Sequence, residues 1–120
     1  HVLFRRQRQM CIRDRIHCDE FQTQGTDKIA ERIKKRVGNN PLYLSIDIDV
    51  LDPAYAPGTG TPEIAGMSSR EMVNVLRGLS GLNLISADVV EVSPAYDHAE
   101  VTSLAAATIV YELTNLFAKK

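Results

Sequence analysis

Two apolar segments connected through a helix constrain the fold of this chain more than any other feature. Residues 42–47 (LYLSID) and 84–90 (LISADVV) are short and mostly apolar, which predicts two buried strands. Between them, Ser68 and Glu71 have the spacing of a capping box and predict a helix that runs to about Leu79. Because no hairpin turn joins the strands, this helix is a crossover and the strands run parallel. Strands this apolar further predict a sheet that is covered on both faces.

Two further helices are predicted on either side of this unit. Residues 26–37 carry apolar side chains at every fourth position, with Thr26 as the expected N-cap and Gly38 as the expected end. The last helix is expected from about 100 to 117, with Asp97 as its N-cap. The order helix, strand, helix, strand, helix favours an α/β fold with a parallel sheet.

Composition excludes several classes of protein. The chain has 120 residues and a mass of 13.3 kDa, which allows one domain or part of a larger one, and two strands make a thin sheet for an α/β domain. Outside the first 16 residues, 9 Lys+Arg stand against 14 Asp+Glu, and such an acidic body predicts no nucleic-acid partner. No apolar run approaches the roughly 18 residues of a membrane-spanning helix, so no membrane partner is predicted.

The first 16 residues differ from the remainder. They contain five arginines and one aspartate, which could form a basic arm for nucleic acid or membrane, or the end of a transit peptide. A third interpretation is that the segment is foreign to the protein. It is favoured, because the string RRQRQMCIRDR resembles one that recurs as an artefact in translated reads. We therefore expect residues 1–16 to be foreign, residues 17–120 to form the domain, and the native N-terminus to be missing. Both cytoplasmic and mitochondrial localisation then stay open.

Two carboxylates follow the first strand. Alternation along a strand places Asp47 and Asp49 on the same face, at the edge where open α/β sheets bind ligands. Two neighbouring anions repel each other unless a cation lies between them, and oxygen ligands suit Mg²⁺ or Mn²⁺. The alternative is a solvated strand end or a capped turn.

Other candidates lie in the two loops. Glu91 ends the second strand and could hold a planar guanidinium by charge-assisted hydrogen bonds, or form an ordinary salt bridge. Asp88 is expected to point to the opposite face. Asp52 is expected to start a turn, and His98 is assigned to a capping cluster rather than to a metal. The Pro- and Gly-rich loop 52–67 is long enough to predict a functional role.

Two blocks of sequence resemble a known family. SIDIDVLDPAYAPGTGTPEIAGMSSRE (45–71) and ADVVEVSPAYDHAEVTSLAA (87–106) are similar to the signature stretches of the ureohydrolases, which include arginases and agmatinases. The resemblance implies a three-layer α/β/α fold around a parallel sheet, of which this chain holds the C-terminal part. It also implies two Mn²⁺ ions and hydrolysis of a guanidinium group with release of urea.

The resemblance carries over onto four residues. It implies that Asp47 and Asp49 are metal ligands, that Glu91 holds the substrate guanidinium, and that Thr61 lines the site; no residue is assigned as catalytic. The loop 57–63 and the later block favour agmatinase, which converts agmatine and water to putrescine and urea. The implied partners are a small guanidino substrate and further copies of the chain in a trimer or hexamer.

The chain also departs from the family pattern. The Gly-Gly-Asp-His and Asp-Ala-His-x-Asp blocks, which carry most of the metal ligands, are absent, so we expect the chain alone to be inactive. Three alternatives stay open. One is another guanidino-acid hydrolase or an arginase, and another is a truncated, non-catalytic paralogue that acts as an interaction subunit. The third is a haloacid-dehalogenase-type phosphatase with Asp47 as nucleophile.

Overall fold

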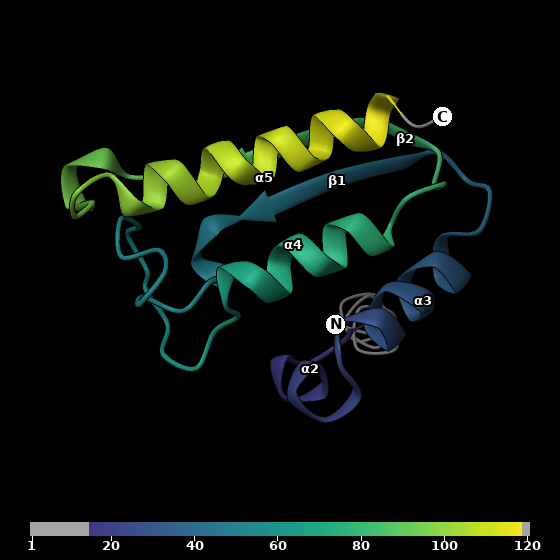
Figure 1. Ribbon diagram of the computed structural model, residues 1–120, viewed down its shortest axis with the longest axis horizontal. Coiled ribbons are helices and arrows are strands. Elements are labelled where there is room, and N and C mark those ends of the chain that lie inside the picture. Colours follow the sequence, from purple (N-terminus) through teal and green to yellow (C-terminus); the bar gives the residue numbers. More distant parts are fainter. Residues whose placement is uncertain (1–14, 119–120) are drawn as a thin grey trace, which may run out of the picture.

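The computed structural model describes residues 15–118 (Figure 1). The elements are α2 (Cys18–Gln24), α3 (Thr26–Val37), β1 (Leu42–Asp47), the 3₁₀ turn η1 (Ile48–Val50), α4 (Ser69–Gly78), β2 (Leu84–Val90), the 3₁₀ turn η2 (Pro94–Tyr96) and α5 (Val101–Ala118). Both predicted strands and the predicted helix 26–37 are confirmed with the expected bounds. The predicted foreign origin of residues 1–16 falls almost wholly outside the described residues and stays a prediction.

Strands β1 and β2 form a two-stranded parallel sheet, as predicted. Leu42 pairs with Leu84 at one end, and Asp47 pairs with Val90 at the other. Helix α4 is the crossover between them. This connection places the carboxyl ends of both strands at one edge, so the residues that follow β1 and β2 become neighbours.

Helices cover one face of this sheet. Figure 1 shows α4 and α5 in front of the strands, with α3 beside α4. The core lies between the strands and these helices; its buried side chains include Ile46, Leu76, Leu84, Ile109 and Leu113. Burial of this apolar surface is what holds the helical layer onto the sheet.

The opposite face of the sheet is open in the described part of the chain. Tyr43 is 56% exposed, and Ser45 and Asp47, two and four residues along β1, are also exposed. The expectation that both faces are covered is therefore wrong for the described residues, which supply the sheet and one helical layer. The reason is visible in β1, where apolar and polar residues alternate and only the apolar set faces helices.

Capping confirms one sequence interpretation and corrects another. Ser68 Oγ accepts a hydrogen bond from the Glu71 N–H (3.2 Å), and the Glu71 carboxylate accepts one from the Ser68 N–H (2.8 Å), which completes the predicted capping box of α4. At α3 the N-cap is Gly25, not Thr26, which is the first helical residue. Gly25 has φ 80°, a conformation that glycine adopts at little cost. Gly38 ends α3, as predicted.

Helix α5 is apolar for most of its length. By length and composition alone it could cross a membrane, with a mean hydropathy of 1.3, whereas the sequence was expected to contain no such run. Core helices of soluble proteins meet the same criterion. In this fold α5 contacts β2 and α4, and its Ile109 and Leu113 lie in the core. One side of α5 therefore packs into the core, and the absence of a membrane partner stays a prediction.

Candidate functional site

Asp47 and Asp49 lie at the carboxyl end of β1, but not on one strand face. β1 ends at Asp47, and the chain then turns through η1, anchored by the fully buried Ile48. The Asp47 carboxylate accepts a hydrogen bond from the Asp49 N–H at 3.2 Å, so it caps this turn. The predicted strand alternation is therefore wrong at Asp49. Both aspartates nevertheless lie at the carboxyl end of β1, one before and one within the turn.

Thr61 reaches the same place from the long loop. Its Oγ1 donates a hydrogen bond to Asp49 Oδ2 at 2.8 Å across twelve residues of sequence. Two of the predicted site residues are therefore in direct contact. A hydrogen bond of this kind fixes the orientation of a carboxylate that is free to bind a ligand through its other oxygen.

Asp52 holds the loop that carries Thr61. One of its oxygens accepts from the Ala54 N–H (2.9 Å), as expected for a turn starter, and the other accepts from the Ala65 N–H (3.0 Å) at the far end of the loop. The Asp52 N–H itself donates to the Met67 carbonyl at 2.9 Å. Hydrogen bonds to Asp52 therefore close the loop at its base.

Glu91 follows the last residue of β2, next to the end of β1. Because Asp47 pairs with Val90, Glu91 lies at the same edge of the sheet as the two aspartates. Its φ is 63°, in the left-handed region, where a residue other than glycine costs on the order of 1–3 kcal/mol. Such a conformation persists only where surrounding contacts impose it, and it is common at functional sites.

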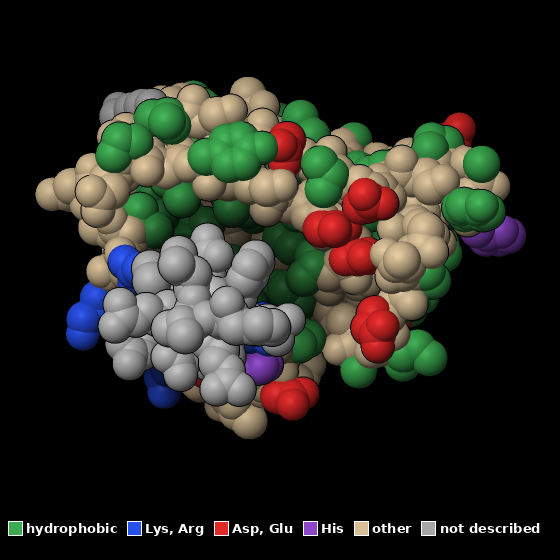
Figure 2. All heavy atoms as spheres, turned by 180° about the vertical axis from the view of Figure 1, so that it is seen from behind, with side chains coloured by type: hydrophobic (Ala, Val, Ile, Leu, Met, Phe, Trp, Pro, Cys, Tyr) green, Lys and Arg blue, Asp and Glu red, His purple; other side chains and the backbone are tan. Residues whose placement is uncertain are grey.

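Acidic residues are concentrated at this edge. Figure 2, which shows the molecule from behind, has acidic side chains gathered toward one end of the face, beside hydrophobic ones. On the open face of the sheet, Asp88 accepts hydrogen bonds from Ser45 Oγ (2.6 Å) and from the Tyr43 hydroxyl. The Ser45 and Tyr43 hydrogen bonds lower the pKa of Asp88. Asp88 therefore lies on the same face as Ser45 and Asp47, and the prediction that it points to the opposite face is wrong, because only the strand register decides which residues share a face.

Asp97 confirms the capping cluster before α5. Its carboxylate accepts hydrogen bonds from the N–H groups of His98, Thr102 and Ser103, each at 2.9 Å. Burial raises the pKa of Asp97, but the hydrogen bonds from Thr102 and Ser103 outweigh it and hold the pKa well below the ordinary value. Asp97 is not the N-cap by position, since α5 begins four residues later, at Val101.

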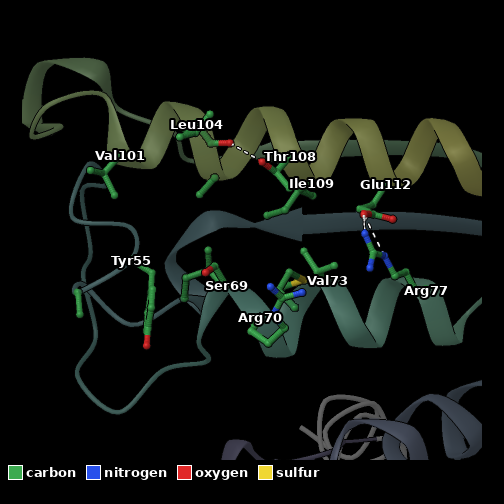
Figure 3. Close-up of a pocket in the computed structure, with 14 residues that line it drawn as sticks. Tyr55, Ser69, Arg70, Val73, Arg77, Val101, Leu104, Thr108, Ile109 and Glu112 are labelled. Atoms are coloured by element: carbon green, nitrogen blue, oxygen red, sulfur yellow. Dashed lines mark hydrogen bonds and ion pairs between the residues drawn. The ribbon is translucent and has the colours of Figure 1, made fainter.

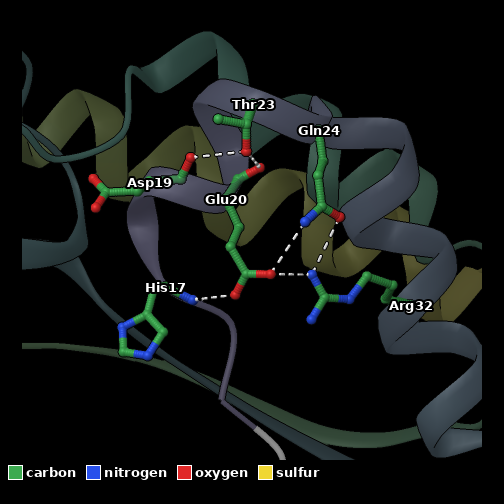
Figure 4. A network of polar contacts seen from close by, with 6 residues as sticks. All are labelled: His17, Asp19, Glu20, Thr23, Gln24 and Arg32. Carbon is green, nitrogen blue, oxygen red and sulfur yellow. Dashed lines mark hydrogen bonds and ion pairs between the residues drawn. The ribbon is translucent and has the colours of Figure 1, made fainter.

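A second polar cluster surrounds α2 at the amino-terminal end of the described segment. Glu20 accepts from the His17 N–H (2.9 Å), from Gln24 (3.1 Å) and from Arg32 of α3 at 2.5 Å (Figure 4). Cys18 is exposed, and its Sγ lies 3.4 Å from the Ala65 carbonyl oxygen.

Among residues 15–118, no group of three or more His, Cys, Asp or Glu side chains is placed to hold a metal ion. Asp47 and Asp49 offer a carboxylate pair with oxygen chemistry that suits Mn²⁺ or Mg²⁺, but two ligands are fewer than such an ion requires. The described residues therefore fit part of a metal site.

A cavity lies elsewhere in the described part of the chain. It has a volume of about 390 Å³ and is located between α4 and α5 (Figure 3). Arg77 of α4 and Glu112 of α5 form an ion pair across it, with Nη2 and Oε1 2.5 Å apart. None of the four predicted site residues lines this cavity. We place the candidate site at the carboxyl edge of the sheet, because that edge gathers the carboxylates.

The sequence model of the Arginase family matches residues 4–115. The chain belongs to the Arginase family. This confirms the predicted resemblance, and the matched range begins within the basic segment 1–16. The phosphatase alternative loses its support, because the same match includes Asp47 and the loop that follows it.

Curated relatives in this family carry agmatinase names. Putative agmatinase 1 of Schizosaccharomyces pombe is 59% identical over 104 residues, which cover 87% of this chain and 26% of that protein. The agmatinase of Enterobacter sp. is 52% identical over 105 residues, covering 88% of this chain and 34% of that protein. The chain thus spans between a quarter and about a third of these relatives.

Solved structures of the family share the fold. A hypothetical agmatinase from Burkholderia thailandensis superposes with a TM-score of 0.82 and 50% identity, over 83% of this chain and 32% of that one. The proclavaminate amidino hydrolase of Streptomyces clavuligerus gives a TM-score of 0.85 and 46% identity, over 87% and 35%. The predicted α/β class with a parallel sheet is therefore confirmed, again for part of the full fold.

Proposed function

We propose that this chain is the C-terminal part of a ureohydrolase, an enzyme that hydrolyses a small guanidino substrate and releases urea. The observation that carries the proposal is the hydrogen bond between Thr61 and Asp49, at the edge where Asp47 and Glu91 also lie. The agmatinase names of the relatives support agmatine as the first substrate, ahead of other guanidino acids and arginine.

Asp47 and Asp49 are proposed as ligands of Mn²⁺. When bound, the metal supplies Lewis acidity and lowers the pKa of a bound water. Thr61 orients the Asp49 carboxylate through its hydrogen bond to Oδ2, which leaves Oδ1 for the metal. The remaining ligands are proposed to come from the part of the family fold that this chain does not cover.

Glu91 is proposed to bind the guanidinium of the substrate. A carboxylate and a planar guanidinium form paired, charge-assisted hydrogen bonds, which fix the orientation of the guanidinium plane. In the reaction, a water oxygen bonds to the guanidinium carbon, and the bond from that carbon to the alkyl-bearing nitrogen breaks. This nitrogen leaves as an amine after gaining a proton, and agmatine gives urea and putrescine.

A second candidate rests on the open face of the sheet. Because Tyr43, Ser45 and Asp47 are exposed there, the chain could act without catalysis, as an interaction subunit that joins a longer partner. The two candidates differ in one measurable respect. The first requires that residues 17–118 support catalysis when the remaining two thirds of the fold are supplied.

The test is a chimaera in which residues 17–118 replace the matching third of the Enterobacter agmatinase. We expect it to release urea from agmatine in the presence of Mn²⁺, and the 120-residue chain alone to release none. In the chimaera, Asp49→Asn should abolish most of the activity and lower the bound metal. Asp27→Asn, on the exposed surface of α3, is the matched control and should change neither.

Two results would count against the proposal. A folded, metal-loaded chimaera that releases no urea from agmatine, guanidinobutyrate or arginine would favour the interaction subunit. Urea release by the purified 120-residue chain would contradict the expectation that it lacks a complete site.

A further inference from the structure

Thr102, in the first turn of α5, connects segments that lie far apart in the sequence. Its side chain is fully buried, and its Oγ1 accepts a hydrogen bond from the Gly58 N–H at 2.7 Å. The two residues are 44 positions apart. A buried hydrogen bond between a hydroxyl and a backbone N–H is costly to leave unmade, so this contact holds the loop 52–67 against α5.

Asp97 fixes the orientation of Thr102. Its carboxylate accepts the Thr102 N–H at 2.9 Å. The Thr102 hydroxyl oxygen has lone pairs to accept hydrogen bonds, and one of them accepts the Gly58 N–H. Ser103 adds two hydrogen bonds to the same carboxylate, from its N–H and its Oγ, both at 2.9 Å.

Gly58 joins the second loop as well. Its carbonyl oxygen accepts the Ser93 N–H at 2.8 Å. The approach is so close that a Cβ on Gly58 would lie 2.8 Å from Asp97 Cβ and 2.9 Å from Thr102 Oγ1. Only a residue without a side chain fits between these groups. The loop after β1, the loop after β2 and α5 therefore meet at this glycine.

The proposed site residues lie a short distance along the chain from this junction. Thr61 is three residues after Gly58, and Glu91 is two residues before Ser93. Between Gly58 and Thr61, the Thr59 side chain is 3% exposed and further restricts the loop. Spans this short leave little freedom for Thr61 and Glu91 to move independently once their neighbours are fixed.

We propose that Gly58, Ser93, Asp97 and Thr102 form a clasp that sets the separation of Thr61 and Glu91, with Thr102 as a positioning residue. The inference rests on the proposed function, because it gives a role to the distance between those two side chains. The clasp touches neither the aspartate pair nor the substrate groups directly. It acts by holding the loop after β1 and the loop after β2 in fixed positions relative to the ends of the two strands.

The first test is structural and uses the 120-residue chain itself. Thr102→Val keeps the side-chain shape and removes the hydroxyl, whereas Thr102→Ser keeps the hydroxyl. In ¹H–¹⁵N spectra, Thr102→Val should increase the exchange rate of the Gly58 amide and shift the signals of Thr61 and Glu91. Thr102→Ser should restore both, and signals from α3 should change in neither variant.

A steric pair of variants tests the same junction without removing a polar group. Gly58→Ala places a methyl group in the occupied space, whereas Gly60→Ala, in the same loop, meets nothing within 4 Å. Gly58→Ala should shift the signals of both Thr61 and Glu91, whereas Gly60→Ala should shift that of its chain neighbour Thr61 and leave Glu91 unchanged. Unchanged Thr61 and Glu91 signals in both Thr102→Val and Gly58→Ala would overturn the proposal. Loss of the fold in both variants would overturn it too, since the residues would then be structural rather than positioning.

The second test measures catalysis in the chimaera. Thr102→Val should lower kcat/KM for agmatine by about 10- to 100-fold, the size expected for a displacement of about 1 Å. The loss should include a raised KM, with bound metal unchanged and Thr102→Ser rescuing it. An unchanged kcat/KM would overturn the clasp. If the parent chimaera itself were inactive, the proposed function would fail, while the spectra would still decide whether the clasp sets the loop positions.

Discussion

The two faces of the β1–β2 sheet differ in what covers them and in the side chains that they carry. The helical face packs α4 and α5 against apolar strand residues and buries a continuous core. The open face presents Tyr43 and Ser45, hydrogen-bonded to Asp88, and leads to the acidic edge. One face of the sheet is therefore covered by helices of this chain, whereas the other face is open among the described residues and carries hydroxyl and carboxylate groups.

The largest expected effect is on the helical face. Leu76 is 2% exposed in the core, and Leu76→Ala should lower the free energy of unfolding by about 2–5 kcal/mol, because it leaves a cavity. Leu104 of α5 is 70% exposed, and Leu104→Ala should change it by less than about 0.5 kcal/mol. Urea denaturation of the two variants measures both. Equal losses of unfolding free energy would mean that the burial of Leu76 is not what stabilises the helical face.

The start of the crossover helix should have a smaller effect. Ser68→Ala removes the hydroxyl that accepts from the Glu71 N–H, and loss of such a cap costs about 1 kcal/mol. Ser69→Ala, one position later and exposed, is the matched control. Thermal unfolding followed by circular dichroism compares them. A Ser69 variant as unstable as the Ser68 variant would remove the cap as the explanation.

In the capping cluster before α5, the expected effect depends on pH. The folded pKa of Asp97 is lower than its ordinary value of 3.8, so its contribution to stability is complete above that value. The contribution is lost as the pH falls through the folded pKa, because protonation removes the acceptor for Thr102 and Ser103. The protection of these two amides relative to their intrinsic exchange rates should therefore stay high to below pH 3.8 and then fall. Loss of protection that begins well above this pH would contradict the expected order of the pKa values.

The smallest expected effect is on the open face. Tyr43→Phe removes one of the two hydroxyl hydrogen bonds to Asp88 and should raise the Asp88 pKa toward its ordinary value. Because the trio is exposed, the unfolding midpoint should hardly move. A ¹³C titration of the Asp88 carboxyl measures the pKa. A clear fall in the unfolding midpoint would show that the open face contributes more to stability than exposed hydrogen bonds are expected to.

Local sequence was a good guide where a local signal was sufficient. Apolar runs predicted the bounds of β1 and β2, and the Ser68–Glu71 spacing predicted the capping box of α4. It was a poor guide where the backbone left regular geometry. Strand alternation failed at Asp49, because η1 begins directly after Asp47, and Thr26 was displaced as N-cap by Gly25.

For the candidate site, the sequence supplied the residue types and the resemblance supplied their roles. Neither could show the contact between Thr61 and Asp49, because a hydrogen bond across a loop depends on how that loop closes. The left-handed conformation of Glu91 and the burial of Thr102 were equally invisible. Both follow from packing between segments that are distant in sequence.

The sequence by itself determined the α/β class, the order of the elements and the family, because periodicity, capping and signature motifs are local properties of the chain. The tertiary structure alone decided which residues meet at the carboxyl edge and which face of the sheet is covered. The reason is physical: parallel strands bring their ends together only through a crossover. The loops that follow β1 and β2 then take their positions from long-range hydrogen bonds such as the one between Thr102 and Gly58.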